Sequence, residues 1–245
     1  MTPRSATNDS ASTGLVGTGS SPEAFTDAEV RRAWLELAAV YGVLMLVVWE
    51  PWRFLGGGAV WLVLRAAVVV FGLVIVARSV RRRRPGLTGL GLARASWPAG
   101  RRSLTLFTVG VVLGIVLLAA LLGSLSTPRL RASWTFDYAV SVILQQLVLH
   151  AFVAEQLWRI TRGNLARTAG SGAVLMAIAH LPNPWLSLMV MPPCAFWIAH
   201  FRRWRNLTGM FVSHFVIGVT AMAFLGELLV NLRTGYGAGN RFGWW

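Results

Sequence analysis

Residues 103–125 read SLTLFTVGVVLGIVLLAALLGSL, and none of them carries a charge. An α-helix needs about 20 mainly apolar residues to cross the hydrocarbon of a bilayer, so this stretch is long enough to span a membrane. Six further apolar runs lie on either side of it, and together they predict an all-α, polytopic transmembrane helix bundle of about seven spans. The predicted spans cover residues 34–54, 60–77, 103–125, 136–158, 169–185, 186–201 and 207–232. The last run is long enough to be divided, which leaves eight spans as an alternative.

The composition of the chain excludes several classes of protein. Of the 245 residues, 55% are hydrophobic and only 13% are charged, whereas a soluble domain carries roughly 25% charged residues. Disordered proteins, coiled coils and ordinary water-soluble enzymes do not have this balance. The net charge of +14 comes from arginine clusters between the apolar runs, so we expect a membrane lipid environment and no nucleic-acid partner. The single cysteine, Cys194, excludes a disulfide framework.

Arginines indicate how the chain is oriented in the membrane. All 23 basic residues are arginine, and segments 78–102, 159–167 and 202–205 hold eight, three and three of them. If the seven spans are right, these three segments lie on one side of the bilayer, and the positive-inside rule places that side in the cytoplasm. The absence of lysine is typical of a GC-rich bacterial genome. We therefore expect an integral protein of the bacterial cytoplasmic (inner) membrane with a cytoplasmic N-terminus.

The first 28 residues differ from the rest of the chain. They are rich in Ser, Thr, Gly and Ala and contain no apolar core, which predicts a disordered cytoplasmic tail rather than a signal peptide. Residues 29–245 then form a single transmembrane domain. Its predicted functional core covers about residues 136–232.

Polar side chains inside the predicted spans give the strongest functional signal. Ionisable residues in a span are costly and indicate function by default, and all four histidines of the chain fall within spans. At a rise of about 1.5 Å per residue, His180 and Gln146 both lie about 18–20 Å from the arginine-rich edge. His150 and His214 lie about 12–14 Å from it by the same rise. The sequence therefore predicts one mid-depth polar layer of Gln145, Gln146, His150, His180 and His214.

Three short motifs around these residues resemble a known family. Gln145 and Gln146 precede His150, the corner His-Leu-Pro-Asn-Pro covers residues 180–184, and Arg-Asn-Leu at 205–207 precedes His214. Over residues 85–219 this pattern resembles the CAAX-protease and bacteriocin-processing (CPBP, or Abi) family, which includes the type II CAAX prenyl endopeptidases. The resemblance implies an intramembrane endopeptidase. Its substrate would be a membrane-tethered peptide or a lipid-modified protein tail.

The chain departs from the motifs that this family typically carries, which are Glu-Glu-x-x-x-Arg, Phe-x-x-x-His and His-x-x-x-Asn. Only His180 and His214 match. In the register set by depth, the remaining motif positions are held by Gln145, Gln146, His150, Met176 and Gly218. A rival register reads residues 154–159 as the first motif; it keeps Glu155 and Arg159 but places the acid well below His180.

The departures leave three chemical outcomes open. The family's reaction uses a glutamate to activate water, and glutamine has no proton that titrates near pH 7. His180 or His150 could serve as the base instead, with the glutamines positioning water or substrate. Alternatively, His150, His180 and His214 could bind zinc, since three histidines and a water make a catalytic zinc site; no other cofactor is expected. The third outcome is an inactive pseudoprotease that binds or assists a membrane partner.

Two further polar positions have a structural interpretation. Glu155 and Arg159 are four residues apart on one predicted helix, a spacing that favours an ion pair near the interface. Asn183 is expected to orient the corner that follows His180.

Overall fold

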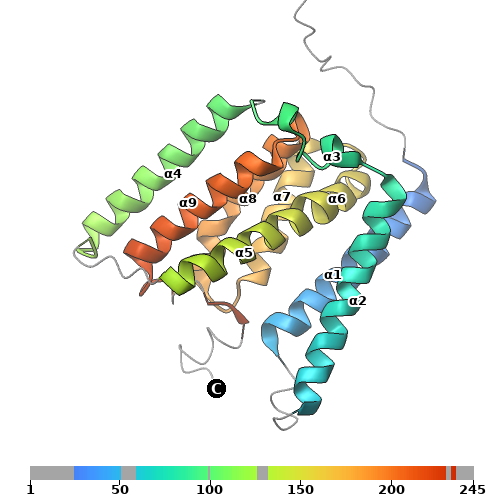
Figure 1. Ribbon diagram of the computed structural model, residues 1–245, viewed down its shortest axis with the longest axis horizontal. Coiled ribbons are helices and arrows are strands. Elements are labelled where there is room, and N and C mark those ends of the chain that lie inside the picture. The colour runs from blue at the N-terminus through green and yellow to red at the C-terminus, as the bar shows by residue number, and fades with distance from the viewer. Residues whose placement is uncertain (1–24, 51–58, 99, 126–131, 230–232, 236–245) are drawn as a thin grey trace, which may run out of the picture.

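The computed structural model describes residues 25–50, 59–98, 100–125, 132–229 and 233–235, and these residues form helices and no strands (Figure 1). Five helical stretches are long and apolar enough to cross a membrane: Asp27–Trp49, Leu62–Arg83, Arg101–Leu121, Thr135–Ile160 and Leu207–Leu225. Many of their large apolar side chains face outward; Leu113 and Leu117 are each 62% exposed. Such a surface is unfavourable in water and suited to lipid. The prediction of an all-α integral membrane protein is therefore supported.

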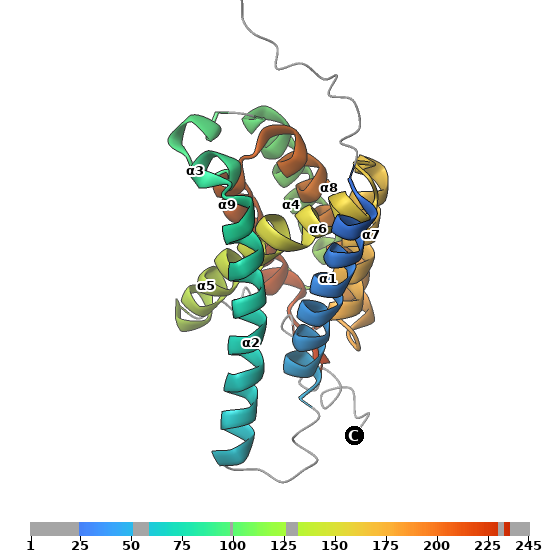
Figure 2. The ribbon, with the colours of Figure 1, turned by 90° about the vertical axis from the view of Figure 1, so that its right-hand side faces the viewer.

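The first two helices pack against each other at one side of the molecule (Figure 2). Helix α1 (Asp27–Trp49) begins with a capping box in which Thr26 and Glu29 satisfy each other's backbone N–H groups. Helix α2 (Ala59–Arg83) extends past its predicted end at residue 77, and the arginines in its last turn suit the negative end of the helix dipole. The predicted disordered tail, 1–28, was too long at its end, because Asp27 and Ala28 are helical; residues 1–24 lie outside the described residues.

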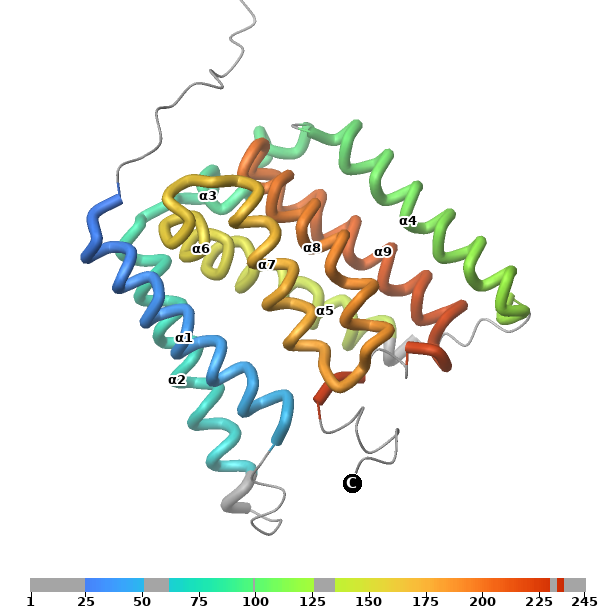
Figure 3. Tube along the Cα trace, turned by 180° about the vertical axis from the view of Figure 1, so that it is seen from behind, coloured from blue at the N-terminus to red at the C-terminus, as the bar shows by residue number. Residues whose placement is uncertain are grey.

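A short connection links α2 to the third long helix. It contains α3 (Gly86–Gly89) and the 3₁₀ turn η2 (Arg94–Ser96), and it leads into α4 (Arg101–Leu121). Helix α4 packs along α9 (Leu207–Leu225), as Figure 3 shows. Helix α9 starts at the predicted residue and ends seven residues before the predicted limit of 232, and residues 230–232 lie outside the described part of the chain.

The predicted fourth span is one continuous helical path with a wide turn in its middle. Helix α5 (Ala132–Val148) passes into the π-helical turn η3 (Leu149–Val153) and then into α6 (Ala154–Ile160). A π-helical turn inserts extra residues into the helix and changes which side chains face inward beyond it; such turns occur frequently at functional sites. This one contains His150.

The predicted fifth and sixth spans are helices α7 (Leu165–Ala179) and α8 (Pro184–Trp204), each capped by an asparagine. Neither is among the five stretches that are long and apolar enough to cross a membrane, and α7 has only 15 residues. The two helices pack closely (Figure 3). A Cβ at Gly172 would lie 2.2 Å from the Cδ1 atom of Ile198, so a larger residue at this position would force the Ile198 side chain to move.

Candidate functional site

A hydrogen bond between α5 and α9 forms the centre of the candidate site. Gln146 is 1% exposed, and its amide nitrogen Nε2 lies 3.0 Å from Nδ1 of His214. An amide nitrogen can only donate, so Nδ1 accepts and the ring proton of the neutral imidazole is on Nε2. His214 therefore offers an N–H donor on the side of its ring away from Gln146.

His180 has the opposite arrangement. It directly follows α7, and its Nδ1 lies 2.7 Å from the carbonyl oxygen of Met176. A carbonyl oxygen only accepts, so Nδ1 carries the proton and Nε2 keeps its lone pair. His180 is half-buried and lies within electrostatic range of His214. The two imidazoles that match the family motifs thus present one potential base and one potential donor.

Tyr138 is a site residue that sequence analysis missed. A Cβ built on Gly218 would lie 1.7 Å from the hydroxyl oxygen of Tyr138, so this hydroxyl fills the space that a side chain at 218 would occupy. Gly218 follows His214 by one helical turn, and the Tyr138 ring meets the His214 ring edge-on at 6.2 Å between centroids. The available signal was the spacing of four along α5 and η3, which puts Tyr138, Gln146 and His150 on one helical face.

Trp197 closes the other side of His214. The centroids of their rings are 4.6 Å apart, and the indole N–H of Trp197 donates to the hydroxyl of Ser213 at 3.2 Å. That hydroxyl also bonds to Thr108 of α4 at 2.7 Å. These contacts hold the His214 segment of α9 against α8 and α4.

The inclusion of Gln145 in the polar layer was wrong. Gln145 is exposed, whereas its neighbour Gln146 is buried. Successive residues on a helix are turned by about 100°, since a turn holds 3.6 residues, and adjacent side chains cannot both face the same partner helix.

His150 is fully buried but makes no direct bond to the two site imidazoles. Its ring lies 5.0 Å from that of Phe201, and it is within electrostatic range of both His214 and His200. Within the described ranges, neither of its ring nitrogens has a hydrogen-bond partner. The fourth histidine, His200, packs apart from the site between Phe196 and Trp204 and lies 3.4 Å from the Ser103 hydroxyl.

The arrangement offers no support for zinc. In the part of the chain that the structure describes, no three His, Cys, Asp or Glu side chains are grouped so that they could hold a metal ion. His214 and His180 each use one ring nitrogen for a hydrogen bond within the protein. His150, the third predicted ligand, is directed into a packed aromatic contact with Phe201.

Glu155, the acid of the rival register, belongs to a separate charged cluster. Its carboxylate pairs with Arg205 at 2.5 Å, Arg202 at 2.8 Å and Arg83 at 3.7 Å. The expected pair with Arg159 is not among the ion pairs of the described residues, so that prediction was wrong. Because α2, α6 and the link between α8 and α9 each supply a member, their arginine-rich ends meet at one end of the molecule, as predicted.

Asn183 holds the corner after His180. Its Oδ1 accepts from the backbone N–H of Leu186 at 3.1 Å, which caps α8. Its Nδ2 donates to the carbonyl oxygens of Leu229 at 2.7 Å and Arg233 at 3.1 Å. Asn183 therefore ties the corner to the chain segment that follows α9, and all of its side-chain polar atoms are used in doing so.

The histidine site, defined as His180, His214, Gln146 and Tyr138, brings together residues from α5, α9 and the end of α7. All four lie within the core predicted at residues 136–232. Their arrangement can accept one proton and donate two hydrogen bonds. No family model, curated protein or solved structure matches this chain.

Proposed function

We propose that the protein is a CPBP-like intramembrane endopeptidase that hydrolyses a peptide bond in a membrane-tethered peptide or a lipid-modified protein tail. The observation that carries this proposal is that His180 and His214 bond through Nδ1 to partners of opposite kind, a carbonyl oxygen and an amide nitrogen. The hydrogen bond from Nδ1 of His180 to Met176 leaves Nε2 of His180 as a base. The hydrogen bond from Gln146 to Nδ1 of His214 leaves Nε2 of His214 as an N–H donor. Hydrolysis of an amide needs both functions in one place.

The proposed reaction uses these atoms in order. Nε2 of His180 takes a proton from a water molecule as the water oxygen attacks the substrate carbonyl carbon. The N–H of His214 and the hydroxyl of Tyr138 donate hydrogen bonds to the oxyanion that forms. The protonated His180 then gives its proton to the leaving amine as the carbon–nitrogen bond breaks. Gln146 acts as a positioning residue, because it contacts His214 rather than the reacting atoms.

The membrane setting supports this chemistry. Seven spans, with the short helix α7 and helix α8 as members of the bundle, would enclose the histidine site within the bilayer. The arginine-rich end would face the cytoplasm, with the N-terminus on that side, in a bacterial cytoplasmic membrane. A substrate held by a lipid or a transmembrane anchor would reach such a site laterally.

A second candidate is a catalytically inactive CPBP-like protein that binds or assists a membrane partner. The observation that favours it is the lack of an acid: among the described residues, no carboxylate pairs with His180 or His214. Within the described ranges, the glutamate that the family uses to activate water has no counterpart beside the imidazoles.

Reconstitution of the full chain in vesicles with a panel of tethered peptides tests both candidates. We expect the wild type to cut at least one peptide, and His180→Ala to lower that rate by about 10²–10⁴-fold, the usual contribution of a general base. His200→Phe is the matched control, because it removes a histidine outside the site and keeps an aromatic ring between Phe196 and Trp204.

The outcomes separate the two candidates. Cleavage that is lost in His180→Ala and kept in His200→Phe supports the enzyme. Cleavage gained only in Gln146→Glu, which restores an acid beside His214, supports the inactive binder. The proposed mechanism is contradicted if the His180→Ala variant cuts as fast as the wild type.

A further inference from the structure

A cavity outside the histidine site lies at the arginine-rich end of the molecule. Its volume is about 590 Å³. The end of α2, the turn α3, the π-helical turn η3, α6, and the end of α8 with the residue that follows it all contribute to its wall. The charged residues that line it are Arg82, Arg83, Arg159, Arg205 and Glu155.

The lining carries an excess of positive charge. Four guanidinium groups face one carboxylate, so three positive charges remain uncompensated by the lining itself. Arg82 pairs with Glu36 outside the lining, whereas Arg83 and Arg205 share Glu155. Arg159 lines the cavity and, in the described segments, forms no ion pair at all. A concave site with this balance attracts an anion, because unpaired charges in a partly dry environment are costly.

Several of these arginines are held rigidly. The Nε atom of Arg83 donates to the carbonyl oxygen of Ser79 at 3.2 Å, and its Nη2 donates to the carbonyl oxygen of Ala151 in the π-helical turn. Arg205 donates to the carbonyl oxygen of Gly89 at 3.3 Å as well as to Glu155. Preorganised guanidinium groups lose little freedom when they bind, and their planar fork suits a phosphate.

We propose that this cavity binds a phosphate group, carried by the headgroup of an anionic phospholipid. The lipid source is favoured by the apolar surface of α2, the helix that ends at the cavity. Along α2, Val70, Phe71 and Leu73 are 58%, 57% and 53% exposed, and the apolar sequence gives way to arginine from Arg81. The cavity thus lies where an apolar surface meets the arginines, the level at which headgroups lie above their acyl chains.

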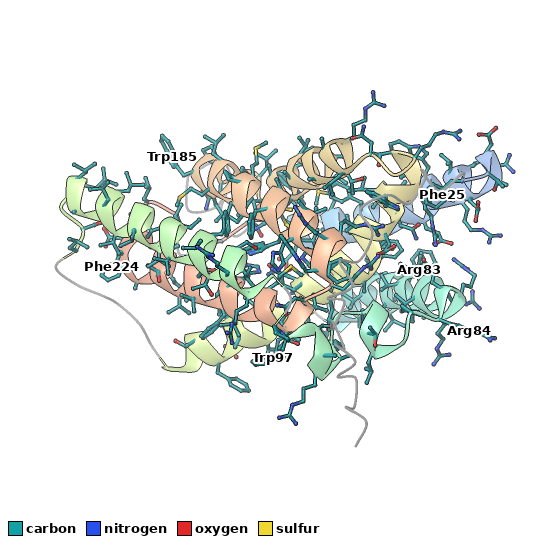
Figure 4. The ribbon with its side chains drawn as sticks, turned by 90° about the horizontal axis from the view of Figure 1, so that it is seen from above. Phe25, Arg83, Arg84, Trp97, Trp185 and Phe224 are labelled. Carbon is teal, nitrogen blue, oxygen red and sulfur yellow. The ribbon has the colours of Figure 1, made fainter. Side chains whose placement is uncertain are left out.

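Neighbouring arginines provide a matched control. Arg83, the last residue of α2, has a 15% exposed side chain that pairs with Glu155 of α6, whereas the next residue, Arg84, is exposed at the edge of the molecule (Figure 4). Arg84→Gln and Arg159→Gln each remove one positive charge from the arginine-rich end of the molecule. Only Arg159→Gln removes that charge from the lining of the cavity. This substitution breaks no ion pair of the described residues.

The test titrates the full chain in a neutral maltoside detergent and follows binding by isothermal calorimetry. The three probes are dioctanoyl phosphatidylglycerol, dioctanoyl phosphatidylcholine and inorganic phosphate. We expect saturable binding of phosphatidylglycerol that Arg159→Gln weakens by about tenfold or more, as for loss of a charge-assisted hydrogen bond, and that Arg84→Gln leaves unchanged. Arg82→Gln, with Arg81→Gln as its control, gives a second pair of variants.

The probes distinguish the possible sources of the phosphate. Binding of phosphatidylglycerol alone supports the lipid, and binding of inorganic phosphate that is also weakened by Arg159→Gln supports a phosphate site without a need for acyl chains. The proposal is overturned if no probe saturates, if phosphatidylcholine binds as tightly as phosphatidylglycerol, or if Arg84→Gln and Arg159→Gln weaken binding equally.

Discussion

Two buried polar groups in this molecule are held together by different forces. The histidine site contains neutral side chains joined by single hydrogen bonds, such as the 3.0 Å contact between Gln146 and His214. The arginine cluster, defined as Glu155 with Arg83, Arg202 and Arg205, contains only charged groups joined by ion pairs. The first lies among α5, α9 and the end of α7, and the second lies where the arginine-rich ends of the helices meet.

The difference follows from the cost of charge in a bilayer. A charged side chain is expensive at the centre of the hydrocarbon and tolerable near the interface, so a chain can build a charged cluster only at the ends of its spans. A polar group at mid-depth is then built more cheaply from side chains that are neutral at rest. Imidazoles, an amide and a phenol meet this condition.

The largest effect is expected when the charged cluster loses its acid. Glu155→Gln leaves three arginines in contact without their carboxylate, and removal of one partner from a buried ion-pair network costs about 3–5 kcal/mol of unfolding free energy. Thermal unfolding of the full chain in detergent measures the loss. Asp27→Asn is the control, because its ion pair with Arg162 is exposed and should contribute nothing measurable. Equal melting temperatures for the two variants would show that the cluster is not a stabilising network.

A smaller effect is expected at the contact between α5 and α9. Gly218→Ala places a methyl group 1.7 Å from the Tyr138 hydroxyl oxygen, and the ring must move, at a cost of about 1–3 kcal/mol for overpacking. Gly114→Ala on α4 is the control, since nothing lies within 4 Å of its added Cβ and alanine favours a helix. The two variants should shift the melting temperature in opposite directions. A Gly218→Ala protein as stable as the wild type would mean that Tyr138 does not occupy that space.

The smallest effect is expected at His150. Both of its ring nitrogens are buried and without a hydrogen-bond partner among the described residues, so His150→Phe removes two desolvated polar atoms and keeps an aromatic ring beside Phe201. Replacement by an apolar group of similar shape should change the unfolding free energy by no more than about 1 kcal/mol. His214→Phe, by contrast, leaves the Gln146 amide unpaired and should cost about 1–3 kcal/mol. A loss at His150 as large as that at His214 would show that the His150 nitrogens are bonded after all.

Residue spacing in the sequence predicted well those features that depend on a single helix. The apolar runs are helices close to the predicted positions, with ends that differ by up to seven residues. The predicted polar layer included both Gln146 and His214, and the structure joins these two side chains. Depth gave no information about rotation, and for that reason Gln145 was placed beside Gln146 although the two face different surroundings. The local spacing of Glu155 and Arg159 was likewise a poor guide, because the π-helical turn and three arginines from elsewhere in the chain determine the partners of Glu155.

The sequence by itself determined the class of protein, the positions of the helices and the end at which the arginines gather. Those properties depend on the length of apolar runs and on local charge, which each segment carries without any partner. Tertiary structure alone decided that Tyr138 fills the space beside Gly218 and that Glu155 is surrounded by arginines up to 72 residues away in the chain. Contacts of this kind depend on how helices cross and rotate against one another, which no spacing within a single segment specifies.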